Sequence, residues 1–162
     1  MKCELQDMIN ECNRELLDIE TRIGNLQPTD KERQYLSNYA LIKACGTVEY
    51  VYRSIVADFF SNLADERIDT YLDVMVRQGS GSAKYDNMKG LLNKFDVEWA
   101  TRFKEEVQSL SDSQRLISAS NSLVTNRHAF AHGQNPTATF LDIKNYYQDV
   151  LRLIAIFDSI VC

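Results

Sequence analysis

The sequence predicts an all-α fold, an antiparallel bundle of about six to seven helices. Apolar residues recur at steps of three and four along most of the chain, which is the spacing of one helix face, and no stretch shows the alternation of a strand. The only flexible low-complexity patch, Gly79-Ser80-Gly81-Ser82, is a loop too short to link domains. With 162 residues, 44% of them apolar and 25% charged, the composition is that of one globular domain over residues 1–162.

Two long helices are expected on either side of Pro28. The first is closed off by Pro28, and Thr29 or Asp30 caps the second, which continues to about Ala64. The apolar seam of the first helix is Leu5, Met8, Cys12, Leu16, Ile19, Ile23 and Leu26, and that of the second is Leu41, Val48, Tyr52, Ile55 and Phe59.

The middle of the chain is expected to hold shorter helices. One covers about 66–77 and ends at the Gly-Ser loop, and two more are separated near Asp96, which caps the second of them. Asp112 is expected to cap the following helix, whose apolar side is Leu116, Ala119, Leu123 and Phe130.

The final helix, from Phe140, has an unusually wide apolar surface. Its main seam is Ile143, Tyr147, Val150, Ile154, Phe157 and Val161, and a flank beside it holds Phe140, Tyr146, Leu153 and Ile160. Because so wide an apolar surface is seldom left in water, one side is expected to face the core and the other a second subunit.

The net charge of −5 argues against a general nucleic-acid coat, which needs many basic contacts to phosphates. The acidic excess lies away from the C-terminal third: residues 111–162 hold four basic and four acidic residues. A local RNA site therefore remains compatible with the charge.

The chain shows neither a signal peptide nor a membrane span, so a cytoplasmic location without membrane contact is expected. Its four cysteines, Cys3, Cys12, Cys45 and Cys162, lack the paired spacing of a metal site and are interpreted as reduced structural thiols. No metal and no cofactor are expected.

The segment Arg127-His128-Ala129-Phe130-Ala131-His132-Gly133 contains both histidines of the chain. On a continuous helix Arg127 and His132 would lie about 140° apart around the axis. They can converge only if the helix stops near Ala131, and Gly133 is suited to end it, with Pro136 just beyond.

An Arg, four intervening residues and a His at a helix end, with His128 directly after the Arg, resembles the motif of the HEPN superfamily of RNases. The subgroup paired with nucleotidyltransferase antitoxins usually carries a Tyr two positions after the His, where this chain has Gln134. The Ala131-His132-Gly133 ending is closer to the stand-alone or defence-associated groups, such as RiboL-PSP. The resemblance implies a metal-independent endoribonuclease that acts at a cleft between two subunits.

The two motif residues have the chemistry that RNA transesterification needs. An imidazole exchanges protons near neutral pH, which suits His132 to act on the ribose 2′-hydroxyl or on the leaving oxygen. A guanidinium donates paired hydrogen bonds to a phosphate, which suits Arg127 to stabilise the charge that develops there. One set per chain supplies one acid-base group, so a homodimer that brings two sets together is expected.

Each of these residues also has a plainer interpretation. Arg127 and His132 could simply cap the helix, since cations there complement its dipole, and the four-residue step from His128 to His132 is also a metal-ligand spacing, although no third ligand is evident. Otherwise His128 is expected to orient the phosphate or to bond the partner's site.

Four further residues are candidates for supporting roles. Glu49, within the apolar second helix, could pair with Arg127 or face the solvent, and Asn126 could contact RNA or cap locally. Tyr146 and Tyr147 could stack on bases, but Tyr147 lies on the core seam and is better explained by packing.

The sequence therefore predicts a homodimeric endoribonuclease for single-stranded or loop RNA, acting as a toxin or defence effector with an antitoxin or defence protein as a partner. Arg127 and His132 are the catalytic candidates, and His128, Asn126 and Glu49 the supporting ones. The alternative is a non-catalytic helical module that binds RNA or protein.

Overall fold

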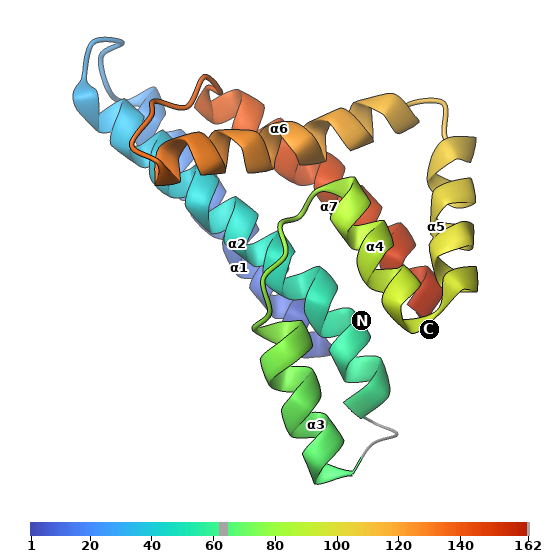
Figure 1. Ribbon diagram of the computed structural model, residues 1–162. Helices are drawn as coiled ribbons and strands as arrows, with labels where there is room; N and C mark the ends of the chain where they lie inside the picture. The colour runs from blue at the N-terminus through green and yellow to red at the C-terminus, as the bar shows by residue number, and fades with distance from the viewer. Residues whose placement is uncertain (62–64, 162) are drawn as a thin grey trace.

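The computed structural model describes residues 1–61 and 65–161, and within them it is all-helical (Figure 1). This confirms the predicted fold class. The elements are α1 (Cys3–Gly24), α2 (Lys31–Ser61), α3 (Glu66–Leu72), a π-helical segment η1 (Asp73–Arg77), α4 (Tyr85–Phe95), α5 (Val97–Ser109), α6 (Ser113–Ala131) and α7 (Phe140–Val161). The predicted end of the second helix, about Ala64, lies outside the described residues, as does Cys162.

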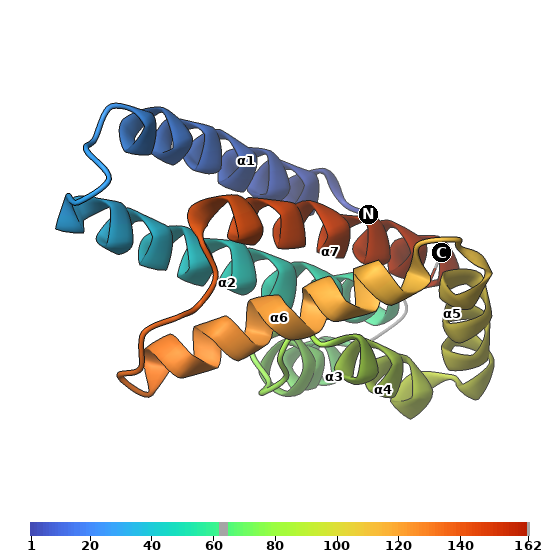
Figure 2. The ribbon, with the colours of Figure 1, turned by 90° about the horizontal axis from the view of Figure 1, so that it is seen from above.

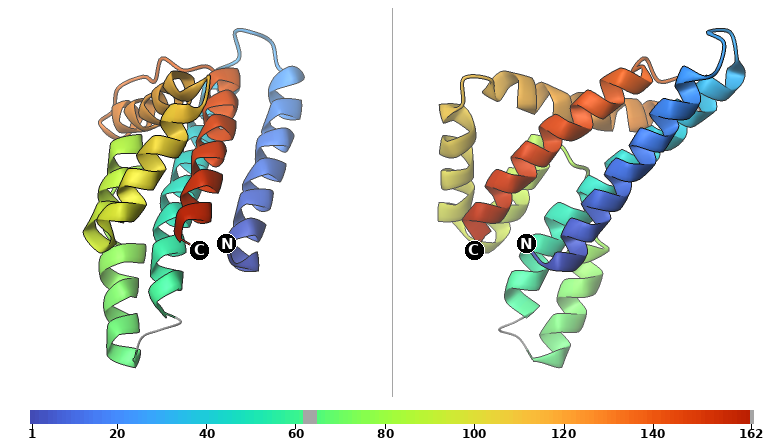
Figure 3. Two further views of the ribbon diagram at one scale, coloured as in Figure 1. Left: turned by 90° about the vertical axis from the view of Figure 1, so that its right-hand side faces the viewer. Right: turned by 180° about the vertical axis from the view of Figure 1, so that it is seen from behind.

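The long helices α1, α2, α6 and α7 form the body of the molecule (Figure 2). Helices α1 and α2 run antiparallel, as do α6 and α7, whereas α2 and α7 run in the same direction, so the bundle is not antiparallel throughout. The shorter α4 and α5 lie near the end of α7, and α3 packs beside the end of α2 (Figure 3). The chain's two ends come close together at one end of α1 and α7.

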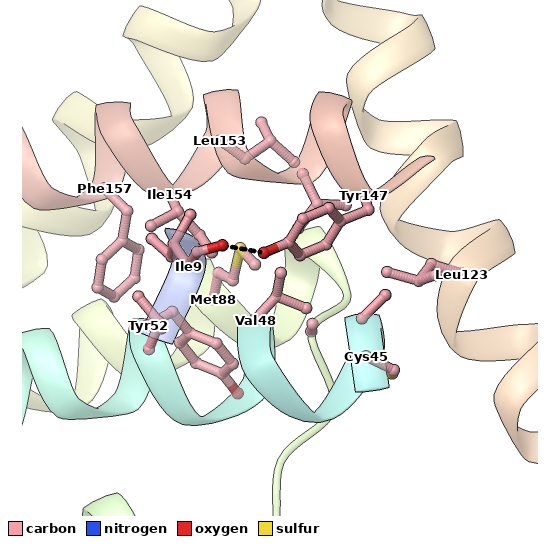
Figure 4. Packing of buried hydrophobic residues seen from close by; sticks show 14 of the residues in the cluster. Ile9, Cys45, Val48, Tyr52, Met88, Leu123, Tyr147, Leu153, Ile154 and Phe157 are labelled. Carbon is pink, nitrogen blue, oxygen red and sulfur yellow. Dashed lines mark hydrogen bonds between the residues drawn. The ribbon is translucent and has the colours of Figure 1, made fainter. Parts of the chain in front are cut away.

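The core is built where α7 crosses α2 (Figure 4). Tyr52 of α2 meets Phe157 of α7 edge-on, with ring centroids 5.8 Å apart, and Phe103 of α5 meets the same ring at 5.7 Å. Tyr147 is fully buried, and its hydroxyl points at the Ile9 carbonyl at 3.5 Å. The packing interpretation of Tyr147 is therefore confirmed.

Both apolar sides of α7 are covered by the chain itself. The flank residues Phe140, Leu153 and Ile160 are buried together with the main seam. The expectation that this flank needs a second subunit is wrong, because α2, α5 and α6 pack against the helix. Side chains of α7 also bond to α1, among them Tyr147 to Ile9 and Lys144 to Glu20. Any subunit contact has to use another surface.

The helix ends follow the predicted chemistry at Asp96 but not at Asp112. The Asp96 carboxylate accepts the backbone N–H groups of Glu98 and Trp99 and so caps α5. Asp112 precedes α6, yet its carboxylate makes no capping bond. It binds Arg152 of α7 at 2.6 Å instead, because that guanidinium competes for the same oxygens.

The helix expected over residues 66–77 changes its winding near its end. From Asp73 the backbone adopts π-helical winding, and the Gln78 N–H donates to the Asp73 carbonyl at 2.9 Å, five residues back. Arg77 stabilises the segment by bonding Asp73 and Asp58. π-Helical segments are rare in proteins, and those that occur are often found at functional sites. The η1 segment leads directly into the Gly79–Ser82 loop.

Within the described residues, no helix combines the length and the hydrophobicity that a membrane span needs. The cysteines Cys3, Cys12 and Cys45 are free thiols.

Candidate functional site

Helix α6 ends where the motif requires it. Its last residue is Ala131, and Gly133 takes the left-handed conformation, with φ of 73°. The Gln134 N–H donates to the Ala129 carbonyl at 2.8 Å and the Gly133 N–H to the Phe130 carbonyl at 3.0 Å. These two bonds close the helix end in a Schellman motif, for which glycine at this position is favoured. The predicted stop is confirmed, and it turns the chain away from the axis at His132.

Asn126 holds the loop that follows the motif. Its side-chain oxygen accepts the N–H groups of Thr137 and Ala138, both at 2.9 Å, and its amide donates to the Ser122 carbonyl at 2.9 Å. The side chain is buried. Both polar atoms are therefore used within the chain, which favours the local role of Asn126 over direct contact with RNA.

Arg127 forms an ion pair with Glu49 across α6 and α2. The Arg127 Nη2 lies 2.9 Å from the Glu49 carboxylate, which is 9% exposed, whereas the Arg127 side chain is 32% exposed. The solvated alternative for Glu49 is wrong. The other carboxylate oxygen accepts from the Cys45 thiol at 3.6 Å, so both oxygens have partners.

The local charges fix the protonation of this group of side chains. Burial, with the nearby Glu49 carboxylate, raises the pKa of Cys45 to about 12, so the thiol stays neutral. Burial lowers the pKa of Arg127, but the interactions with Glu49 and Cys45 together raise it by more, and the guanidinium remains charged. Glu49 thus holds the charged Arg127 guanidinium at the end of α6, and part of that guanidinium remains accessible to solvent.

A cavity of about 460 Å³ opens beside this ion pair. Its lining comes from three segments that are distant in sequence: α2, the end of η1 with its following loop, and α6. The lining residues are Glu49, Arg53, Gln78, Gly79, Ser80, Gly81, Ser82, Arg127 and His128. The structure therefore brings Arg127, His128 and Glu49 together at one hollow.

His132 does not line this cavity. It follows the last residue of α6, it is exposed, and its backbone N–H donates to the His128 carbonyl at 3.0 Å. Its imidazole is free to face a substrate or a second chain. Of the two histidines, His128 lines the cavity with Arg127, and His132 is exposed at the residue that follows the helix.

The sequence analysis missed Arg53 and assigned no function to the Gly79–Ser82 loop. Arg53 lies one turn beyond Glu49 on α2, and its Nε donates to the Glu49 carbonyl at 2.8 Å. The four-residue step between them was the available signal, since it places both on one helix face. The loop could not be located from its composition, because nothing local indicates that it reaches α6.

Among residues 1–61 and 65–161, no group of three or more His, Cys, Asp or Glu side chains is arranged to hold a metal ion.

The sequence model of one family, described as RiboL-PSP-HEPN, matches residues 7–162 of the chain. The searches of curated proteins and of solved structures found no match to this chain.

Proposed function

Because the chain belongs to the RiboL-PSP-HEPN family, we propose that it is a metal-independent endoribonuclease that cuts single-stranded or loop RNA. The observation that carries the proposal is the Arg127 guanidinium, held by Glu49 beside a cavity that His128 also lines, with His132 exposed at the residue that follows α6. A fixed cation beside an exposed imidazole suits a phosphodiester, which develops negative charge while protons are transferred around it.

In the proposed reaction a base removes the proton of the ribose 2′-hydroxyl, and the 2′-oxygen attacks the adjacent phosphorus. The bond from phosphorus to the 5′-oxygen breaks, and an acid protonates that leaving oxygen. The products are a 2′,3′-cyclic phosphate and a 5′-hydroxyl. His132 is assigned proton transfer, Arg127 stabilisation of the phosphoryl oxygens, and His128 orientation of the phosphate.

A homodimer is part of the proposal, because one chain supplies one exposed His132 and the reaction needs both a base and an acid. The surface best placed for it is a strip on the outer face of α2, where Tyr35 is 67%, Tyr39 53% and Ile42 42% exposed. The same helix face continues to Glu49 and Arg53 at the cavity. A two-fold contact along this strip would bring two motifs close together.

Light scattering tests the dimer. The protein is expected to be a dimer at micromolar concentration, and Ile42→Glu is expected to yield monomers. Leu17→Glu is the matched control, since Leu17 is 53% exposed on α1 and lies outside the strip. A wild-type monomer that RNA does not dimerise would contradict the composite site.

Cleavage in excess EDTA tests the chemistry. Purified protein is expected to cut single-stranded RNA and to leave a 2′,3′-cyclic phosphate or the 3′-phosphate derived from it. Strict dependence on a divalent ion, or products that all carry 5′-phosphate and 3′-hydroxyl ends, would contradict the proposal.

We further propose that the protein acts in the cytoplasm as a toxin or defence effector with a partner protein. Expression of the protein is then expected to arrest growth, and co-expression of a neighbouring gene that encodes the partner is expected to relieve the arrest.

A second candidate, a non-catalytic module that binds RNA or protein, is favoured by one observation. Arg127 and Asn126 already bond to groups within the chain, as capping and packing residues do. RNA binding without any cleavage would select this candidate.

A further inference from the structure

Two-thirds of the residues that line the cavity lie outside the motif and its ion pair. Arg53 contributes a second guanidinium from α2, and the Gly79–Ser82 loop contributes backbone and two hydroxyl side chains. At about 460 Å³ the hollow is within the range of roughly 300–1,000 Å³ found for small-ligand sites. It has room for more than the single phosphate that Arg127 would hold.

Arg53 is anchored but not neutralised. Its Nε donates to the Glu49 carbonyl at 2.8 Å, which fixes the stem along α2. In the part of the chain that the structure describes, no carboxylate lies within ion-pair distance of Arg53, whereas Arg127 is paired with Glu49. Two guanidinium groups and one carboxylate at the cavity leave a net positive charge, which favours an anion.

The Gly79–Ser82 loop, which lines the cavity together with Arg127 and His128, is held at both of its ends. A Cβ on Gly79 would lie 2.3 Å from the Met75 carbonyl oxygen, so only glycine lets the backbone pack this closely on the end of η1. At the other end, the Ser82 carbonyl accepts from Asn87 at 3.2 Å and from the Tyr52 hydroxyl at 3.3 Å. Ser80 and Gly81 are held between these anchors.

We propose that Arg53 and the Gly79–Ser82 loop form a subsite for a backbone phosphate of the RNA strand, next to the phosphate that Arg127 holds. The inference rests on the proposed function for the identity of the strand. Arg53 is a positioning residue in this arrangement: it holds the neighbouring nucleotide in register and takes no part in proton transfer. The Arg53 guanidinium and the Ser80 and Ser82 hydroxyls that line the cavity are groups that can donate to a phosphate, and such contacts carry no base preference.

The test measures binding separately from cleavage. Arg53→Gln, Arg53→Lys and Gly79→Ala are each combined with His132→Ala, and binding of a short fluorescent oligouridylate is followed by anisotropy from about 50 to 200 mM salt. Arg102→Gln is the matched control, because Arg102 is exposed on α5, away from the end of α6 that carries the motif (Figure 1). Melting temperatures are recorded for every variant.

Arg53→Gln is expected to weaken binding about tenfold, as loss of one charge-assisted contact does. It should also lower the slope of log affinity against log salt by about 0.7, which is one phosphate contact on a single strand. Arg53→Lys should restore that slope, because it keeps the charge. Gly79→Ala should weaken binding by displacing the loop while leaving the slope closer to wild type.

Without the His132→Ala change, Arg53→Gln should raise KM about tenfold and change kcat much less, since a positioning contact of this kind acts on binding. If Arg53→Gln binds RNA with the affinity and salt slope of Arg102→Gln, the subsite is refuted, even where the wild-type protein cuts RNA. If the wild type cuts no RNA but binding depends on Arg53 as described, the subsite stands and the RNase proposal fails. Absence of any RNA binding by the wild type overturns the subsite.

Discussion

The two ends of α6 each carry an arginine-carboxylate pair, and the two pairs differ in their surroundings. At the start of the helix Asp112 binds Arg152 at 2.6 Å, with side chains 31% and 47% exposed. At the end Arg127 binds Glu49 at 2.9 Å, and the carboxylate there is only 9% exposed. Bond length does not distinguish the two ion pairs, but the burial of the Glu49 carboxylate and the cavity beside it do.

The physical difference lies in what happens when one partner is lost. An exposed carboxylate returns to water at little cost, and exposed ion pairs contribute little to stability. A buried carboxylate without its cation keeps the cost of its desolvation. The Arg127 pair therefore contributes to stability, and the proposed reaction gives Arg127 a catalytic role as well, so variants must be chosen to separate the two.

The largest effect is expected for His132→Ala. It should lower RNA cleavage by about 100-fold or more, because general acid-base catalysis contributes a factor of that size. The melting temperature should not change, since the imidazole is exposed and the helix end is closed by backbone bonds to Ala129 and Phe130. Cleavage and thermal unfolding measured on one preparation check both statements. Equal losses of activity and stability would mean that the motif is only a cap.

Arg127→Ala should lower cleavage by about 100-fold as well, but it is not a neutral change. It leaves Glu49 buried without a cation and should lower the free energy of unfolding by about 2 kcal/mol. Denaturant unfolding and single-turnover cleavage measure the two effects. The loss of stability is expected because the Arg127 guanidinium is the ion-pair partner of the Glu49 carboxylate.

Two companion variants separate the roles of Arg127. Glu49→Gln combined with Arg127→Ala should recover most of the stability and none of the activity, because the stranded charge is gone while the phosphate still lacks its guanidinium. Arg127→Lys should keep much of the stability and little of the activity, since an ammonium lacks the planar fork. Activity that returns with stability in the double variant would show that Arg127 acts only through the fold.

The sequence was sufficient to predict most of the helices, but it was not sufficient to predict which residues line the cavity beside the motif. Helical periodicity, with Asp96 and Gly133, places the start of α5 and the end of α6, because these signals are local. The first helix was expected to continue to Pro28, but α1 ends at Gly24, so Leu26 lies outside it. The winding of η1 was missed, since a single inserted residue leaves the apolar period almost unchanged. The meeting of Arg53 and the Gly79–Ser82 loop with α6 depends on how helices cross, which no local pattern encodes.

The wide apolar surface of α7 is a second case in which a local pattern could not predict a contact between distant parts of the structure. Periodicity correctly identified which of its residues need cover, and Leu153 and Ile160 are indeed buried. It could not identify what covers them, because neighbouring helices of the same chain and a second subunit bury a seam equally well. The exposed strip on α2 is absent from the sequence argument for the same reason.

Asn126→Ala should have an intermediate effect. It removes the acceptor of two backbone N–H groups, at Thr137 and Ala138, and should lower the free energy of unfolding by about 2 kcal/mol, or the melting temperature by about 6 °C. Cleavage per folded molecule should fall only severalfold, because the side chain positions the loop after His132 and is buried from the substrate. A loss as large as that of His132→Ala at unchanged stability would instead assign Asn126 to the RNA.

The smallest effect is expected for Arg152→Gln, at the exposed end of α6. The hydrogen bond from Arg152 lowers the pKa of Asp112, so the pair stabilises the fold above the unfolded carboxyl pKa of about 3.9 and this contribution is lost as pH falls through the lower folded value. Arg115 also binds Asp112, at 2.7 Å, and remains after the substitution. The variant should therefore melt within about 2 °C of the wild type at pH 7, and this small difference should disappear as pH falls through the lowered folded pKa of Asp112. Thermal melts over a series of pH values from 7 downward, with RNA cleavage at pH 7 unchanged, check this. A loss of stability equal to that of Arg127→Ala would mean that burial of the carboxylate does not distinguish the two pairs.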